Sequence, residues 1–391
     1  MSRVCQSWGL GARTRSVEFR SRQDPVRGPG RGVGSAPGAL PGVATLHGVI
    51  AKSARRPPVI ADVARVAGVS VPTVSRVLTG SVPVSPAKRA LVMAAIDKLG
   101  YRPSAAARAL AGGRVSMIAV LASNTTRYGY ASTLRGIEEG ARAAGYTVVI
   151  TVVESEDPSI VDEAVTLVLG QPVAGVIVLE FDPAGVRASR ALPNSLPVVG
   201  ASAGRVVRRT RPHAYLDDRA AAMRAVEYLL GLGHHTVHHV AIPLSGGPNV
   251  GRASGWRDAL IAAGAPVPEL IGAGWDPASG YEVGAMLARD ESVTAVLAGN
   301  DELAIGLMRA FVDAGRAVPG DVSVVGFDDE PFAAMWTPGL TTVAQDFGGL
   351  GRRAFDLLES LLRTGAAPRT STRTPQLVIR NSAGPPRAPR L

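Results

Sequence analysis

The sequence VIADVARVAGVSVPTVSRVLTG, residues 59–80, predicts two short helices with a tight turn between them. In its first half apolar residues recur at spacings of three and four, which gives a helix one buried face. These residues are Ile60, Val63, Ala64 and Ala67. Gly68 follows where a turn between helices needs a left-handed backbone angle that a side chain would oppose. The spacing therefore predicts a helix-turn-helix unit.

The second helix of this unit is predicted to begin at Ser70, a residue type that caps helices. Pro72 fits its first turn, where no intrahelical donor is lost. Its inner face is predicted to be Val74, Val77 and Leu78. Its outer face begins with Val71, Pro72 and Thr73 and continues to Arg76, which are the positions that a recognition helix presents to the major groove of DNA.

A third helix is predicted to open at Ser85 and Pro86 and to stop at Gly100. Its apolar residues are Val92, Ile96 and Leu99. A chance helical hairpin could imitate the first half of this pattern. Three helices in about 40 residues, with small residues where helices cross, favour an all-α DNA-binding domain.

The net charge of +10 is unevenly distributed along the 391 residues. The first 114 residues carry +14, residues 363–391 carry six arginines and no acid, and the body between them carries −10. Basic ends on an acidic body indicate a polyanionic partner for the N-terminal end. For residues 1–58 alone, arginine supplied to a disordered tail by a GC-rich genome explains the charge equally well.

The single cysteine, Cys5, excludes an intramolecular disulfide and a cysteine metal cluster. The N-terminus has no apolar signal segment, and no run of 18 apolar residues occurs. We therefore expect a cytoplasmic protein. Residues 1–57, rich in Gly, Pro, Ser and Arg, are either a disordered basic extension or a segment upstream of the true start.

After Arg114, short apolar runs alternate with amphipathic helical patterns. The strand candidates are residues 117–121, 147–153, 175–179, 197–199, 237–242, 295–298 and 322–327. The helical patterns between them include residues 132–144, 217–232, 255–263 and 301–314. This alternation predicts parallel sheets covered on both faces, and the number of strands favours two lobes with a cleft between them.

The expected fold class is an N-terminal all-α helix-turn-helix domain with a hinge helix, followed by a two-lobed α/β domain with parallel sheets. The expected boundaries are 58–103 for the first domain, 104–114 for the hinge and linker, and 115–375 for the second domain. Within the second domain we expect one lobe at 115–214 plus 345–375 and the other at 215–344, with a last strand and tail at 376–391.

Two segments, IADVARVAGVSVPTVSRVLTGS and LGYRPSAAARALAGG, resemble the N-terminus of the lac repressor (LacI/GalR) family. The resemblance covers nearly the whole chain after residue 57. It implies a transcription regulator, expected to be a repressor, whose residues 104–111 form a hinge helix on DNA. By the same match Leu110 is a wedge in the minor groove, a role that suits an apolar side chain. Alternatively, Leu110 packs at a domain junction.

The residues expected to contact DNA are Ile60, Ser70, Val71, Pro72, Thr73, Ser75, Arg76, Ser104, Arg108 and Leu110. The chain departs from the family at the start of the recognition helix, where members often carry polar side chains. Val71 and Pro72 can touch a thymine methyl group, but their side chains form no hydrogen bonds. Arg76 is therefore expected to carry more of the base readout.

Four further segments resemble the sensing domain of that family, which is similar to periplasmic sugar-binding proteins: residues 233–256, 274–281, 295–311 and 321–347. The resemblance places a small-molecule effector, expected to be a sugar, in the cleft between the lobes. The residues implied to face it are Arg252, Trp275, Asn300, Asp328 and Gln345. Charged and amide groups suit such a ligand because each buried hydroxyl must regain a hydrogen bond, and a flat indole can cover a sugar ring.

Several of these residues have structural alternatives. We expect Asp301 to cap the helix that starts there and Asn300 to contact ligand. Asp328 follows a strand directly, where α/β sheets build their sites. Trp275 and Trp336 could instead belong to the core. Residues 123–130, at the end of the first strand, are expected to line the cleft, while Leu179 or Glu180 and Ser202 are the first-lobe candidates that leave the ligand class open.

An enzyme is the first rival interpretation, and the chain lacks a P-loop, GxSxG, HExxH or a cysteine nucleophile in its folded region. The clustered histidines 234, 235, 238 and 239 lack the carboxylate partner of a usual zinc site, so we expect a solvated surface cluster, no metal and no cofactor. A periplasmic binding protein is the second rival. It would carry a signal peptide and no helix-turn-helix.

The resemblance also implies an assembly and a mechanism. A homodimer would place two recognition helices on a pseudo-palindromic operator, and effector binding would make the hinge helices form or melt. The C-terminal tail has no leucine heptads of the kind that form tetramers in this family, so we expect a dimer.

Overall fold

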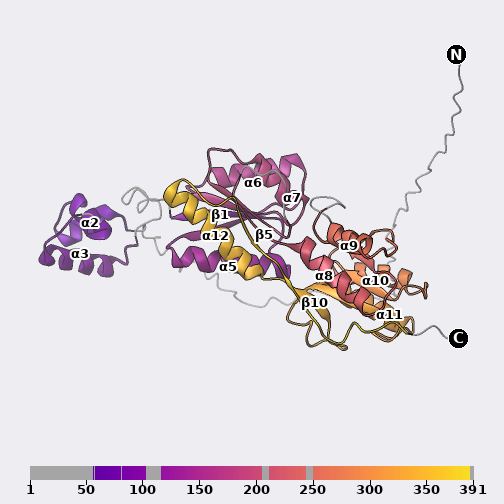
Figure 1. The fold of residues 1–391 in the computed structure, drawn as a ribbon. Helices are drawn as coiled ribbons and strands as arrows, with labels where there is room; N and C mark the ends of the chain where they lie inside the picture. Colours follow the sequence, from indigo (N-terminus) through magenta and orange to yellow (C-terminus); the bar gives the residue numbers. More distant parts are fainter. Residues whose placement is uncertain are drawn as a thin grey trace, which may run out of the picture. The chain divides into compact units, whose positions relative to one another are not determined.

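The computed structural model describes Arg56 and residues 58–80, 82–102, 116–204, 211–243 and 250–387 (Figure 1). The expected hinge residues Ser104, Arg108 and Leu110 lie outside the described residues. None of the described helices is long and apolar enough to cross a membrane.

The first domain contains the three predicted helices, α1 (Ile60–Ala67), α2 (Val71–Thr79) and α3 (Pro86–Leu99). Gly68 takes the left-handed angle that the turn requires, with φ 65°, and its N–H donates to the Ala64 carbonyl. The common core of the three helices contains Val63, Val74 and Val92, all fully buried. The local sequence pattern therefore predicts the observed three-helix domain, because each helix presents one apolar face to the other two.

Two details of α2 differ from the expectation. Leu78 is 36% exposed rather than buried, because Val74 and Val77 already fill the space against α1 and α3. Ser70 occupies the N-cap position, but its Oγ lies 2.9 Å from Thr73 Oγ1 and accepts no backbone N–H.

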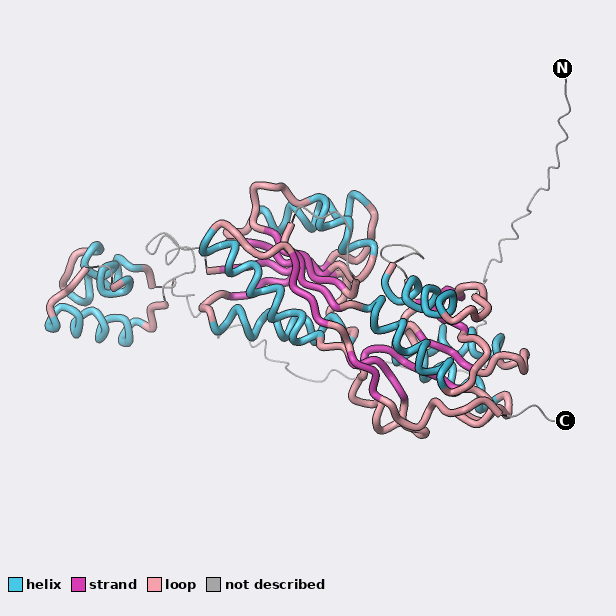
Figure 2. Tube along the Cα trace, viewed as in Figure 1, coloured by secondary structure: helices cyan, strands magenta, loops and turns pink. Residues whose placement is uncertain are grey.

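The second domain has two lobes, each built on a six-stranded sheet (Figure 2). In lobe 1 the strand order is β11-β5-β4-β3-β1-β2, and every pair is parallel. The strands are β1 (Met117–Ala122), β2 (Thr147–Val152), β3 (Gly175–Leu179), β4 (Val198–Ser202), β5 (His213–Leu216) and β11 (Thr370–Arg373). One face packs on α5 (Tyr128–Ala143) and α12 (Phe347–Thr364), and the other on α6 (Pro158–Leu169) and α7 (Pro183–Ala191).

Lobe 2 repeats this architecture with the order β12-β10-β9-β8-β6-β7, in which only β12 runs antiparallel to its neighbour. The strands are β6 (His238–Ala241), β7 (Ile271–Gly272), β8 (Ala295–Ala298), β9 (Ser323–Asp328), β10 (Thr341–Ala344) and β12 (Gln376–Val378). One core cluster joins this sheet to α8 (Asp218–Gly231) and α9 (Gly251–Ala262). A second joins it to α10 (Pro277–Leu287) and α11 (Asp301–Asp313).

The chain crosses between the lobes at β5 to α8, at β10 to α12, and at β11 to β12. The three crossings lie side by side, since Asp217 N–H donates to the Arg373 carbonyl and the Arg373 guanidinium is 2.8 Å from Asp346. The expected lobe boundary between residues 214 and 215 falls inside β5, and β12 belongs to the second sheet. The two lobes are therefore connected by three neighbouring segments of the chain.

The seven strands expected from apolar runs are all present; β3 and β8 have the expected ends, and the ends of the other five differ by up to three residues. The described strands outside these runs are β5, β7, β10, β11 and β12, of which β12 is the last strand expected within residues 376–391. β11, with the sequence TSTR, is polar because it lies at the exposed edge of its sheet, where hydrogen bonds to β5 rather than burial hold it. Edge pairing of this kind leaves no hydrophobic signal in the sequence.

Candidate functional site: the interlobe cavity and the face of α2

The outer face of α2 is open to solvent at the positions expected to read DNA. Val71 is 40% exposed, Pro72 and Arg76 are also exposed, and Thr73 and Ser75 are half-buried. Ile60, at the start of α1, is half-buried against the core of the three helices. The face therefore offers apolar contact surface at its start and a guanidinium one turn later, which are groups suited to a thymine methyl and to guanine or phosphate.

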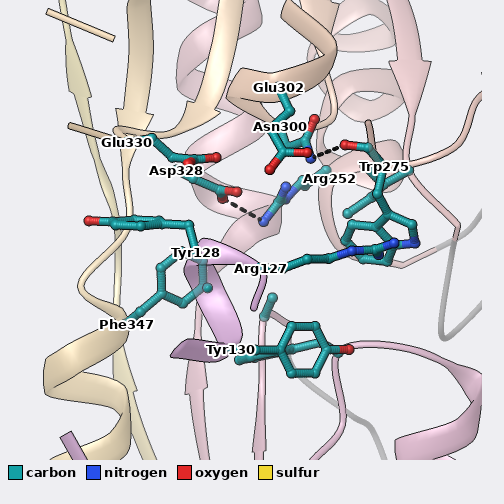
Figure 3. Close-up of a pocket in the computed structure, with 14 residues that line it drawn as sticks. Arg127, Tyr128, Tyr130, Arg252, Trp275, Asn300, Glu302, Asp328, Glu330 and Phe347 are labelled. Carbon is teal, nitrogen blue, oxygen red and sulfur yellow. Dashed lines mark hydrogen bonds and ion pairs between the residues drawn. The ribbon is translucent and has the colours of Figure 1, made fainter. Parts of the chain in front are cut away.

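A cavity that opens to solvent lies between the two lobes of the second domain, with about 490 Å³ of space free of protein atoms when its open mouth is included (Figure 3). Four of the five residues expected to face a ligand line it: Arg252, Trp275, Asn300 and Asp328. The other lining residues are Arg127, Tyr128, Gly129, Tyr130, Phe181, Ala203, Ile242, Glu302, Glu330 and Phe347. Both lobes contribute, so a ligand bound here would touch both at once.

Arg252 is the best-anchored side chain of the cavity and is only 7% exposed. Its Nε donates to Asp218 at 2.7 Å, one Nη lies 3.3 Å from Asp328, and the other donates to the Gly299 carbonyl. The guanidinium also lies 4.0 Å from the centre of the Phe327 ring. Burial alone would lower its pKa, but Asp218 and Asp328 raise the pKa overall, so the group stays charged and fixed in direction.

Gln345 does not line the cavity as the resemblance implied. Its Nε2 donates to one oxygen of the buried Asp218 carboxylate at 2.8 Å, while Arg252 Nε donates to the other oxygen. Gln345 thus holds the residue that holds Arg252. Gln345 could therefore affect a bound ligand through its hydrogen bond to Asp218 and the hydrogen bond of Asp218 to Arg252.

The expectation that Asp301 caps α11 was wrong, whereas the expected ligand contact of Asn300 stays a prediction because Asn300 lines the cavity. Asn300 is the cap: its Oδ1 accepts from Leu303 N–H at 2.8 Å, while its Nδ2 donates to the Trp275 carbonyl at 2.9 Å. Asp301 turns inwards and accepts from Thr342 Oγ1 at 2.5 Å and from the Glu330 N–H at 2.8 Å. Burial raises the pKa of Asp301 to about 7. A carboxylate that ties α11 to β10 is therefore unavailable to cap the helix.

Asp328 ends β9 with a backbone angle that side chains rarely adopt, with φ 120°, and Asp329 follows at φ 54°. Such conformations cost about 1–3 kcal/mol each and persist where surrounding contacts enforce them. Arg252 contacts Asp328, and Arg380 contacts Asp329 at 2.7 Å. Burial raises the pKa of Asp328 well above its usual value, and the Arg252 guanidinium offsets part of this effect. Strain and an unusual charge environment coincide at this turn.

The cavity contains functional groups that the sequence alone did not identify. Glu302 and Glu330 each lie two positions after an expected site residue, and that spacing was the only available signal. The expectation that residues 123–130 line the cleft is confirmed by Arg127, Tyr128 and Tyr130. The Arg127 guanidinium lies 4.6 Å from the centre of the Trp275 ring, so one lobe reaches the other across the cavity (Figure 3).

Three first-lobe candidates, Leu179, Glu180 and Ser202, are buried and do not line the cavity. Ser202 Oγ instead lies 2.7 Å from His213 Nε2 and donates to the Gly204 carbonyl. Trp336 is 40% exposed and does not belong to the core.

The expected surface cluster of histidines is wrong for His234 and His239, which are buried, whereas His235 is exposed and His238 is half-buried. His239 is fully buried, with Nδ1 2.9 Å from the Leu297 carbonyl, and burial lowers its pKa to about 4. His234 contacts Thr294, Ser323 and the Gly384 carbonyl. Within the described ranges no group of three or more His, Cys, Asp or Glu side chains could hold a metal ion. His234 and His239 thus pack within lobe 2 through hydrogen bonds to β8, β9 and their flanking segments.

Comparisons with known proteins match both domains. Residues 59–104 match the family described as bacterial regulatory proteins, lacI family, and residues 226–383 match the periplasmic binding protein-like domain. Catabolite control protein A of Priestia megaterium is 32% identical over 304 residues, covering 76% of this chain and 91% of that protein. The lactose operon repressor of Escherichia coli K12 is 33% identical over 310 residues, covering 78% of this chain and 85% of that protein.

The structure agrees with these matches. A solved structure of the lac repressor dimer bound to operator and the anti-inducer ONPF is similar with a TM-score of 0.76 and 30% sequence identity, over 84% of this chain and 100% of that chain. Coverage of both domains in one chain distinguishes a regulator from an enzyme and from a binding protein without a DNA-binding domain. The chain therefore belongs to the lacI family of bacterial regulatory proteins and is a DNA-binding transcription regulator.

Proposed function

We propose that the protein is a cytoplasmic, homodimeric repressor that binds a pseudo-palindromic operator and responds to a small polar effector, a sugar, in the interlobe cavity. The observation that carries the proposal is the anchoring of Arg252. Its partner Asp218 follows one crossing between the lobes directly, and Gln345, which holds Asp218, lies in a second crossing. A ligand that moves Arg252 therefore acts directly on the segments that set the angle between the lobes.

On the DNA side, we assign base contacts to the outer face of α2. Val71, Pro72 and Thr73 would meet base edges, and Arg76 would contact guanine or phosphate. Ile60, Ser70 and Ser75 would pack against the phosphate backbone at the ends of the same surface. The roles of Ser104, Arg108 and Leu110 rest on the sequence resemblance alone.

On the effector side, Arg252 and Asp328 would exchange hydrogen bonds with ligand hydroxyl groups, and Trp275 would cover an apolar face of the ring. Asn300 would act by holding the Trp275 backbone, and Gln345 by holding Asp218. In this scheme two of the five expected contacts are positioning residues. The arrangement suits a ligand with several hydroxyl groups because buried donors and acceptors both point into the cavity.

The DNA half of the proposal is tested with a labelled operator fragment selected from random duplexes. Fluorescence anisotropy at several salt concentrations should give a steep loss of affinity as salt rises, because Lys and Arg displace counterions from phosphates. Leu110→Ala should weaken binding to the selected site far more than binding to random duplex. Equal losses on both would exclude the wedge role, and no binding at low salt would exclude the regulator.

The assembly and the effector half are tested on the same protein. Light scattering should give a dimer, as in the solved lac repressor dimer. A sugar that binds the folded protein should raise its melting temperature and change operator affinity in the same concentration range. A ligand that raises the melting temperature but leaves operator affinity unchanged would contradict the coupling through Asp218.

A further inference from the structure

Charges in the interlobe cavity are not balanced among the described residues. Three carboxylates line it, from Glu302 on α11 and from Asp328 and Glu330 at the end of β9, against two arginines, Arg127 and Arg252. Figure 3 shows Asp328 and Glu330 together on one wall, with Glu302 beside Asn300 on the adjoining wall. A charged ligand would bind where one of these groups lacks an oppositely charged partner.

The two arginines differ in their partners. Arg252 contacts Asp218 and Asp328, so its charge is taken up by the protein. Arg127 lies over the Trp275 ring, and its guanidinium opposes the effect of burial on the pKa of Glu302. The charge of Arg252 is therefore already paired within the protein, and Arg127 lies on the Glu302 side of the cavity rather than beside Glu330.

Glu330 differs from the other carboxylates of the cavity. It is 9% exposed and lines the cavity, and within the part of the chain that the structure describes its side chain makes no hydrogen bond or ion pair. The ionisable groups near it are Asp301 and Glu302 on α11, Asp328 on β9, and Tyr128 on α5. All four are acidic groups. A buried carboxylate without a cation is costly, and it is stabilised when a ligand brings one.

We propose that the effector is a hexose-sized, polyhydroxylated molecule carrying one protonated amine, and that its ammonium group binds against Glu330 with Asp328 and Glu302 nearby. This inference rests on the proposed role of the cavity as the effector site. The cavity lies between the lobes and opens to solvent, and Tyr128, Trp275 and Phe347 supply apolar walls for the ring of such a molecule. Its hydroxyl groups would meet the remaining donors of Arg252.

The charge environment gives the binding a proton signature. Burial, together with Asp328 and Glu302, raises the pKa of Glu330 to about 8, so the empty site holds a proton there at pH 7. An ammonium ion favours the ionised carboxylate, and Glu330 then releases that proton to the buffer. Calorimetry at pH 7 in buffers of different ionisation enthalpy should therefore detect release of up to about one proton on binding.

The test compares three matched sets of probes: glucosamine, galactosamine and mannosamine, each with its parent hexose and its N-acetyl derivative. Thermal-shift and calorimetric titrations are run on the wild-type protein, on Glu330→Gln, and on Glu291→Gln as a control on an exposed glutamate of the same lobe. At least one hexosamine should bind about 10- to 100-fold more tightly than its parent hexose and N-acetyl form, the range expected for a charge-assisted hydrogen bond. Glu330→Gln should abolish this preference, and Glu291→Gln should retain it.

The outcomes separate this inference from the proposed function. If a neutral hexose binds as tightly as its amine and shifts operator affinity, the effector site stands and the amine is excluded. If no hexosamine binds, the ligand class is overturned, while operator binding of the same sample still tests the regulator. If Glu330→Gln keeps the full preference for the amine, or if binding releases no proton, the assignment of Glu330 is wrong. The Gln side chain is nearly isosteric with the protonated carboxyl group that the empty site holds at pH 7, so we expect the variant to fold.

Discussion

The anchoring of Arg252 predicts a large and specific loss of stability in Asp218→Ala. Asp218 is 2% exposed and accepts hydrogen bonds from Arg252 Nε at 2.7 Å and from Gln345 Nε2 at 2.8 Å. Without it, the buried guanidinium keeps only Asp328, at 3.3 Å, as a charged partner. Removing one partner of a buried ion pair costs about 3–5 kcal/mol, because the other charge is left uncompensated.

Asp258→Ala provides a matched control. Asp258 pairs with Arg219 at the same 2.7 Å, but the two side chains are 39% and 54% exposed, so water screens the pair. Its removal should cost less than about 1 kcal/mol. Urea unfolding followed by circular dichroism measures both free energies, and a variant that changes the midpoint without changing the slope has changed stability.

The difference in unfolding free energy between Asp218→Ala and Asp258→Ala tests whether Asp218 holds Arg252 in place. A loss of 3–5 kcal/mol corresponds to a fall in melting temperature of roughly 6–20 °C in a domain of this size. If Asp218→Ala and Asp258→Ala lose the same free energy of unfolding, Asp218 does not hold Arg252 in place. The proposed route from the ligand to the crossings between the lobes would then have no support.

Three further predictions concern packing, pH and DNA. A Cβ at Gly136 of α5 would lie 2.1 Å from the Gly348 carbonyl oxygen, so Gly136→Ala should force α5 and α12 apart and cost about 1–3 kcal/mol of unfolding free energy in urea. In Glu330→Gln, the gain in stability over wild type should grow as pH rises from 5 to 8; the raised pKa of Glu330, about 8, means that its ionisation destabilises the wild-type fold over this window. Arg76→Ala should weaken operator binding about 10-fold or more, as measured by anisotropy.

Each of these has a control and a contrary outcome. Gly231→Ala, where a Cβ meets nothing within 4 Å, should raise the unfolding free energy by about 0.4–1 kcal/mol, and equal effects of both glycine variants would contradict the close helix contact. A stability difference for Glu330→Gln that is flat from pH 5 to 8 would contradict the raised pKa. If Arg76→Ala lowers the salt dependence by about one ion and weakens all sequences alike, Arg76 contacts phosphate rather than a base.

The sequence by itself determined the features that depend on neighbouring residues. The spacing of Val63, Ala64 and Ala67, with Gly68 after them, specifies the turn between α1 and α2, because helix faces and left-handed turns are set within a few residues. Apolar runs specify the buried strands for the same reason. The resemblance carried by such local segments was sufficient for the family, and it placed Arg252 and Asp328 at the cavity.

Only the tertiary structure decided which polar groups meet. Gln345 lies 127 residues from Asp218 in sequence and holds it by a hydrogen bond, so an expected ligand contact became a positioning residue. Asn300 rather than Asp301 caps α11, because the Asp301 carboxylate accepts hydrogen bonds from Thr342 and from the Glu330 backbone, which are distant in sequence. Glu330 became the unpaired carboxylate of the cavity for the same reason. Hydrogen bonds and ion pairs between separate strands depend on the packed fold, which no local pattern encodes.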